Sequence, residues 1–171
     1  MTDDPMAILD GLDRVEDAFG GFTHGQPTYE AFLDPGRSDP AIIQLRKACR
    51  LLDTCRLLRD RNGYYTSVVE MSFAAIERSL EGYALYVSND SIDDFRAGHE
   101  RAYERAAELG ALSPKSTARL KDVFVENRSA SYYRDTIANE RQSAALFTLA
   151  VRIHEHIYQF AGLSHECRCE S

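Results

Sequence analysis

The sequence predicts an all-α protein, an antiparallel bundle of five to six helices. Every strong apolar repeat has the spacing of an α-helix, and no segment alternates for long like a half-buried strand. Residues that cap or stop helices flank these repeats, and the connections after residue 40 are short, which favours antiparallel neighbours. The predicted helices span residues 5–19, 41–61, 64–87, 92–109, 114–127 and 139–161.

The first predicted helix is amphipathic and leads into a loop. Its apolar positions are Ile8, Leu12, Val15 and Phe19. The helix stops at Gly20 and Gly21, since glycine tolerates the left-handed C-terminal cap. Residues 20–40 contain two further glycines and three prolines, which indicates a loop. We therefore expect residues 1–39 to be an N-terminal extension of the main bundle, which spans residues 40–162.

The second and third predicted helices supply much of the core. One face of residues 41–61 carries Leu45, Cys49, Leu52 and Cys55. Both cysteines lie in this apolar pattern, so we interpret them as reduced core residues. Residues 64–87 are apolar over most of the helix circumference. This is typical of a helix at the centre of the core or at a subunit interface.

Capping signals place the later helices. Ser91 and Asp94 form a predicted capping box at the start of residues 92–109, and His99 falls on the apolar face of that helix. Ser113 precedes Pro114, the pattern of an N-cap followed by a first helical proline. The buried face of that helix is predicted to be Leu120, Val123 and Phe124. The last helix opens near Asn139, with Gln142 three residues on.

The composition limits the functions to consider. The formal net charge is −7, so nucleic acid would have to bind through a local arginine cluster rather than the whole surface. Only three of the 20 basic residues are lysines, which suggests a halophilic archaeon as the source, although a GC-rich genome also favours arginine. No run of about 18 apolar residues exists, and the N-terminus is acidic, unlike a secretory signal. We expect a cytoplasmic protein with no membrane contact.

The C-terminal residues 163–171 form a tail with a group of soft ligands. His165, Cys167 and Cys169 are spaced two apart, so an extended chain would point all three to one side. They suit zinc or copper(I), but a structural zinc site usually has four ligands. The alternatives are a frayed tail and a contact with a metal or a partner. We predict no cofactor, keep these three residues as metal candidates, and expect the tail to add little stability, because it contains few apolar groups.

The stretch "ENRSASYYRD" at 126–135 is the main candidate site. If the preceding helix continues, Arg128 and Tyr132 lie one turn apart on the same face. Arg128 can bind a phosphate with two hydrogen bonds, a tyrosine ring can stack on a base, and Arg134 adds a second positive charge. The alternative is that Arg128 pairs with neighbouring carboxylates while the tyrosines pack in the core.

The order of three segments resembles the HEPN domains of prokaryotes. These segments are the tyrosine-containing apolar helix "YYTSVVEMSFAAIERSLEGYAL", the helix end "VFVENRSASYY", and the final helix "QSAALFTLAVRIHEHI". The resemblance covers roughly residues 40–160. It implies a homodimer, and often a toxin encoded beside a nucleotidyltransferase-type antitoxin. Active members are metal-independent ribonucleases with an arginine followed, after four to six residues, by a histidine.

Carried over to this chain, the resemblance assigns the arginine to Arg128, with Asn127 beside it. The histidine would fall at 133–135, where this sequence has Tyr133, Arg134 and Asp135. Tyr132 or Tyr133 takes its place, and tyrosine is a poor general base at neutral pH.

Three hypotheses follow from the absence of this histidine. In the first, Asn127, Arg128 and Arg134 bind RNA, nucleotide or a partner protein within a toxin–antitoxin or defence system. In the second, Arg128, Tyr132 and Tyr133 form an atypical endoribonuclease site, with Glu70 or His99 supplying the base. In the third, the chain is a structural helical interaction module.

Overall fold

The computed structural model describes residues 6–20, 39–133 and 137–169, and the side chains of 6–19, 39–127 and 137–169. These residues form helices and turns, with no strand among them, which confirms the predicted all-α class. The α-helices are α1 (Met6–Gly20), α2 (Pro40–Arg59), α3 (Tyr65–Val87), α4 (Glu100–Glu108), α5 (Pro114–Tyr133) and α6 (Glu140–Phe160). Two short 3₁₀ helices, η2 (Ile92–Phe95) and η3 (Ser164–Glu166), complete the list.

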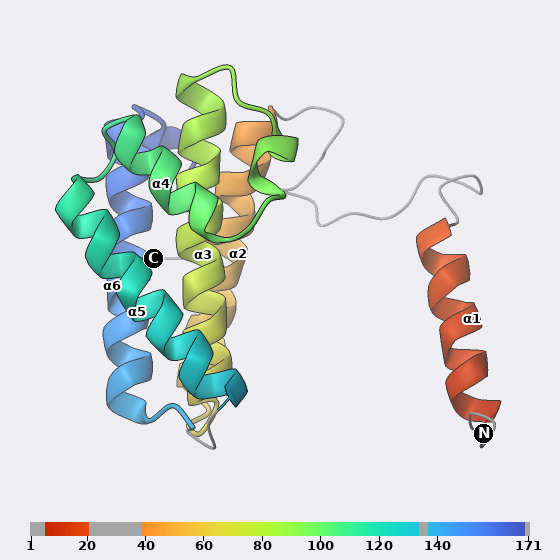
Figure 1. Ribbon diagram of the computed structural model, residues 1–171. Helices are drawn as coiled ribbons and strands as arrows, with labels where there is room; N and C mark the ends of the chain where they lie inside the picture. The colour runs from red at the N-terminus through yellow and green to blue at the C-terminus, as the bar shows by residue number, and fades with distance from the viewer. Residues whose placement is uncertain (1–5, 21–38, 134–136, 170–171) are drawn as a thin grey trace. The chain divides into compact units, whose positions relative to one another are not determined.

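The chain divides into two compact units, Met1–Ala31 and Phe32–Ser171. The first contains α1, and the second contains the bundle. In the bundle α3 packs against α2, α4 and α6, and α4 packs against α5. Figure 1 shows α2, α3 and α6 side by side, with α4 and α5 crossing in front of them. None of the helices in the described ranges has the length and apolar character that a membrane span requires.

Side-chain caps begin several of the helices, and those at Ser113 and Asn139 were predicted from the sequence. The Asp39 carboxylate accepts a hydrogen bond from the backbone N–H of Ala41, and Pro40 opens α2. Asn139 and Gln142 form a reciprocal capping box at the start of α6. Because each cap satisfies backbone N–H groups that the helix leaves unpaired, these starts are fixed by local sequence.

The predicted helix over 92–109 is wrong in its first half. The capping box of Ser91 and Asp94 exists, but it caps only the four residues of η2. Gly98 then adopts a φ of +151°, which favours glycine, and α4 begins two residues later. The break turns His99 out of the core, so that half of its side chain is exposed (51%). The prediction that His99 lies on the buried face is therefore corrected.

Helix α5 is longer than predicted, and its buried face is narrower. It continues from 127 to Tyr133, because serine, alanine and tyrosine do not break a helix. Leu120 is buried as predicted, but Val123 is 47% exposed. Since α5 lies across the bundle, a smaller part of its surface touches the other helices.

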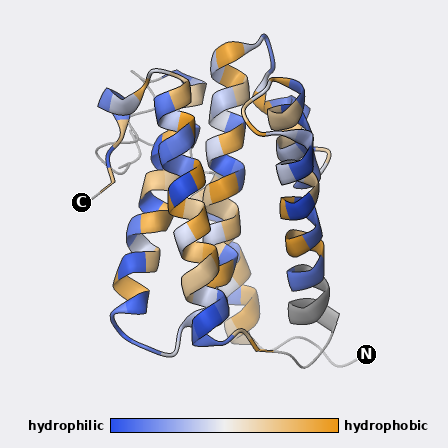
Figure 2. Ribbon diagram, turned by 90° about the vertical axis from the view of Figure 1, so that its left-hand side faces the viewer, coloured by the Kyte–Doolittle hydropathy of each residue, from blue (hydrophilic) through white to orange (hydrophobic). Residues whose placement is uncertain are grey.

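Helix α3 is the centre of the core. Its buried residues lie on all sides, and the largest fully buried ones include Ile76 and Leu80. The neighbouring helices therefore cover most of its apolar residues within one chain, while Tyr86 and Val87 near its C-terminal end are exposed at 46% and 44%. Figure 2 shows apolar and polar residues mixed along the helices of the bundle, as expected of helices with one buried face.

The chain reverses direction sharply at the end of α6. The backbone N–H of Leu163 bonds to the carbonyl of Tyr158 at 2.8 Å, and Gly162 has a φ of +71°. This is a Schellman cap, in which a left-handed glycine closes the helix end. Leu163 is buried, and the Glu166 carboxylate pairs with Arg46 of α2 at 2.7 Å. The tail thus has anchoring contacts that its composition did not indicate.

Candidate functional site

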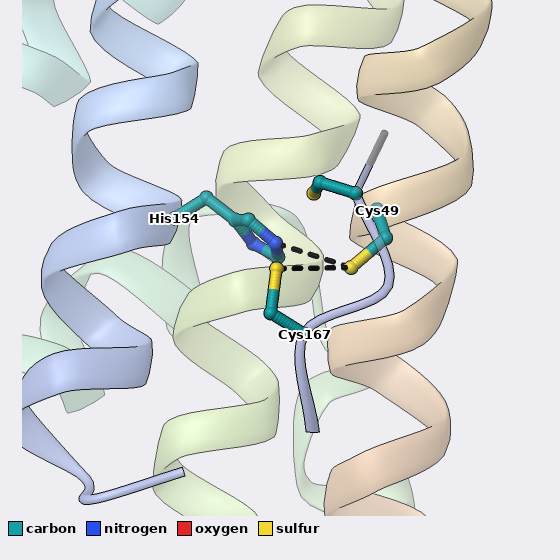
Figure 3. A group of neighbouring side chains, drawn as sticks. Cys49, His154 and Cys167 are labelled. Carbon is teal, nitrogen blue, oxygen red and sulfur yellow. Dashed lines mark hydrogen bonds between the residues drawn. The ribbon is translucent and has the colours of Figure 1, made fainter. Parts of the chain in front are cut away.

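Four side chains of types that can ligate a metal meet where the C-terminal segment crosses α2 and α6. They are Cys49 of α2, His154 of α6, and Cys167 and Cys169 of the C-terminal segment. Their ligand atoms all lie within 4.8 Å of one another. Cys49 Sγ is 3.3 Å from His154 Nε2 and 4.0 Å from Cys167 Sγ, the two contacts drawn in Figure 3. Cys49 and His154 are buried, while Cys167 and Cys169 are partly exposed.

A serine hydroxyl fixes the orientation of the His154 ring. Ser79 Oγ donates its proton to the Ala75 carbonyl at 2.8 Å and lies 2.8 Å from His154 Nδ1. Because the hydroxyl has one proton, its oxygen accepts at the second contact, so the histidine carries its proton on Nδ1. The lone pair of Nε2 then faces the three sulfur atoms. This is the tautomer that a metal-ligating histidine needs.

Hydrogen-bonding groups surround the sulfur atoms of the cluster. The backbone N–H of Arg168 donates to Cys49 Sγ at 3.4 Å, and the Tyr158 hydroxyl lies 3.6 Å from the same sulfur. Hydrogen bonds from Cys169, then from Cys49 and His154, lower the pKa of Cys167. Burial lowers the pKa of His154, but its bonds to Cys167 and Cys49 outweigh burial and raise it.

A second polar group lies on α3 and α4. The buried Glu77 carboxylate accepts a hydrogen bond from His99 Nδ1 at 2.8 Å and another from the Tyr103 hydroxyl at 3.3 Å. Burial, and then the neighbouring Glu77 carboxylate, raise the pKa of Tyr103, so its phenol stays protonated and continues to donate. A carboxylate on Nδ1 orients the imidazole and leaves Nε2 to accept a proton, the arrangement of a general base with its positioning residue.

The Glu77 carboxylate and the His99 imidazole line a small pocket next to the end of α5. The pocket has a volume of about 170 Å³, and its lining includes Glu70, Glu77, His99 and Asn127. A wider groove of about 850 Å³ adjoins it and shares Phe73 and Asn127 with it. The groove is lined mainly by apolar residues of α3, α5 and α6, namely Val69, Phe73, Val123, Val125, Ala145, Leu146 and Leu149.

Residues 3–169 match the family described as a domain of unknown function, DUF8154. The chain belongs to this family. Neither the curated proteins nor the solved structures provide a match to it. The DUF8154 match covers α1, the bundle and both tail cysteines, so the four-residue cluster lies wholly inside the matched region.

The residues predicted from "ENRSASYYRD" are described only in part in this DUF8154 chain. Arg128, Tyr132 and Tyr133 belong to the last turns of α5, but their side chains lie outside the described set. Arg134 lies outside the described residues altogether. The Asn127 side chain is described, and it lines both the pocket and the groove.

Of the three tail residues named as metal candidates, Cys167 and Cys169 lie in the four-residue cluster and His165 does not. The His165 side chain is 71% exposed and lies near the Glu166 carboxylate. His154 takes its place, because its position on α6 points the ring at Cys49. The sequence contained one sign of this ligand, since His154 falls on the apolar face of the last predicted helix. His156 points elsewhere, bonding to the Ala111 carbonyl through Nε2 at 2.8 Å.

Proposed function

We propose that the protein is a HEPN-like homodimer that binds RNA or nucleotide at the end of α5, as a component of a toxin–antitoxin or defence-type system. One observation carries this proposal. Asn127, the residue before Arg128, lines the same pocket as His99, Glu77 and Glu70. Arg128, to which the HEPN resemblance assigns phosphate binding, therefore directly follows a residue that shares a pocket with a histidine–carboxylate pair from other helices.

The dimensions of this region favour a polymer or a partly bound nucleotide. Small-molecule sites usually measure about 300–1,000 Å³, so a pocket of about 170 Å³ holds one polar group such as a phosphate. Glu70 and Glu77 repel phosphate here. The proposal therefore requires the positive charges of Arg128 and Arg134 to outweigh this repulsion.

Binding is tested by titrating labelled single-stranded RNA into the full-length protein over a salt series. Arg128→Ala should weaken binding by about 1–3 kcal/mol, because it removes a charge-assisted contact. Arg119→Ala is the matched control, since it makes the same charge change on the same helix at an exposed position. Equal effects of the two variants would mean that only the overall charge matters and that the α5 end is no site.

Glu70 provides a test of opposite sign. Glu70→Gln removes a negative charge from the pocket, so RNA affinity should rise by about 0.2–1 kcal/mol, the range for exposed charge pairs. The gain should shrink at high salt, because exposed charges are then screened. An unchanged or lower affinity at low salt would exclude phosphate from this pocket.

The second candidate function is a metal-independent endoribonuclease in which His99 is the base. The hydrogen bond from His99 Nδ1 to the buried Glu77 favours it, because it leaves Nε2 at the pocket to act. Nε2 would take the proton of a ribose 2′-hydroxyl, whose oxygen attacks the adjacent phosphorus as the bond to the 5′ oxygen breaks. Arg128 would stabilise the phosphate charge, and Tyr132 or Tyr133 would protonate the leaving oxygen.

This chemistry separates the two candidates. Cleavage should leave a 2′,3′-cyclic phosphate, and His99→Ala should lower the rate by about 10²–10⁴-fold while RNA binding persists. His156→Ala is the control, because that histidine bonds to the Ala111 carbonyl away from the pocket. If no cleavage occurs in the wild type, the protein is a binding component; if His99→Ala cleaves normally, His99 is not the base.

The proposed dimer also has a surface to use. Val123, Val125 and Leu149 are each at least 40% exposed and line the groove together. A partner subunit covering the groove would bury these side chains and bring two α5 ends close together. Light scattering on the full chain tests this, and a Val125→Asp variant should be monomeric. The proposal of a nucleotidyltransferase-type partner is tested by co-purification with the protein encoded beside this gene.

A further inference from the structure

We propose that Cys49, His154, Cys167 and Cys169 bind one Zn²⁺ ion in a closed tetrahedral site, and that this ion holds the C-terminal segment on α2 and α6. The inference is independent of RNA binding, since none of these residues lines the pocket or the groove. It rests on the geometry of the four side chains and on the groups behind them.

The distances fit a tetrahedron with a metal at its centre. Zinc bonds of about 2.3 Å to sulfur and about 2.05 Å to nitrogen place sulfur–sulfur edges at about 3.8 Å and sulfur–nitrogen edges at about 3.6 Å. The observed distance from Cys49 Sγ to Cys167 Sγ is 4.0 Å, slightly longer than the ideal sulfur–sulfur edge. The distance from Cys49 Sγ to His154 Nε2 is 3.3 Å, slightly shorter than the ideal sulfur–nitrogen edge. All four ligand atoms lie within 4.8 Å of one another, so small rotamer shifts complete the shell.

The donor set selects the metal. Three thiolates and one imidazole form a Cys₃His set, which is a standard structural zinc shell. Calcium and magnesium require oxygen ligands, which this cluster does not offer. Copper(I) also accepts soft sulfur, but the fourth ligand and the tetrahedral spacing favour zinc.

The surroundings prepare each ligand. Ser79 holds His154 as the Nδ1–H tautomer, so Nε2 presents its lone pair before any metal arrives. The Arg168 N–H donates to Cys49 Sγ, a contact that stabilises a metal-bound thiolate. The pair Cys167 and Cys169 supplies two ligands from one short segment, and the salt bridge between Arg46 and Glu166 holds that segment against α2.

The role of such an ion is structural. With four protein ligands no coordination position remains for water or substrate, so the site is not a hydrolytic centre. The ion would join residues that are 105 and 118 positions apart in the chain. Since the unfolded chain does not hold these groups together, the binding free energy of the metal becomes folding free energy.

The test measures metal in the full chain purified without a metal-affinity tag. Elemental analysis should find about one zinc per chain, and cobalt(II) substitution should give the intense visible bands of tetrahedral thiolate coordination. Cys169→Ser is the main variant, because Cys169 is partly exposed and near the chain end, so the bundle should fold without it. It should lose the tight zinc and the cobalt spectrum. Cys55→Ser and His165→Ala are the controls, and both should keep one ion.

Each outcome decides the proposal. A wild-type protein without zinc that takes up neither added zinc nor cobalt would overturn it, and so would full retention of metal by Cys169→Ser. Loss of metal in His165→Ala but not in a His154→Gln variant would replace the ligand set with the one read from the tail. A mass two hydrogens lower than the reduced chain, restored by a reductant, would identify a disulfide among these cysteines instead.

Discussion

The hydrogen bond between Ser79 and His154 gives the sharpest quantitative prediction. Ser79→Ala removes the acceptor of the His154 Nδ1–H, and both residues are almost fully buried, at 0% and 2% exposure. An unsatisfied buried donor costs about 1–3 kcal/mol, whereas alanine in a helix regains about 0.5 kcal/mol over serine. The free energy of unfolding should therefore fall by about 0.5–2.5 kcal/mol in the metal-free protein. If zinc is bound, its affinity should also fall by about 10–100-fold, because the ligand tautomer is no longer fixed.

The assay is urea unfolding of the chelator-treated protein, combined with zinc competition against a chromophoric chelator. Ser72→Ala is the matched control, since Ser72 is also a buried serine on α3 and its only described contact is with Cys55 Sγ at 3.8 Å. It should cost less stability and leave zinc affinity unchanged. If the two variants have equal stability and equal zinc affinity, then the Ser79 hydroxyl does not set the His154 tautomer and the reasoning is refuted.

The remaining predictions concern packing and charge. A Cβ atom on Gly82 would lie 2.7 Å from Leu45 Cγ, so Gly82→Ala should destabilise the bundle by about 1–2 kcal/mol, the strain exceeding the gain in helix propensity. Gly11→Ala, with nothing within 4 Å, is its control and should not destabilise; thermal melts in which Gly82→Ala is as stable as wild type would contradict the close packing. Hydrogen bonds from Arg105 hold the pKa of Asp90 below its ordinary value, so the pair stabilises the fold above that value and this contribution is lost as pH falls through the lowered pKa. Asp90→Asn should lower the melting temperature at pH 7, and the melting temperature of the variant should fall less steeply as the pH is lowered. If the wild type and the variant lose melting temperature equally on acidification, this pair does not contribute to the pH dependence of stability.

Local sequence determined most of the helices, because the information for a helix lies within a few residues. The apolar spacing in α2 and α6 and the caps at Asp39, Ser113 and Asn139 each act over one or two turns. The break near Gly98 was not predicted from the sequence, because a single glycine inside a helical pattern does not reveal which φ value it adopts. The presence of buried Cys49 and of two tail cysteines was also readable.

Only the tertiary structure decided which of these groups meet. Cys49 and His154 are 105 positions apart, and no spacing rule connects them; they come together because α2 and α6 both pack on α3. The Schellman cap at Gly162 then turns the tail back across both helices, which brings in Cys167 and Cys169 and leaves His165 in solvent. The pairing of Glu77 with His99 has the same origin, since it depends on how α4 packs against α3. Sites assembled from distant helices depend on long-range packing, and the periodicity of one segment does not show which other segments it packs against.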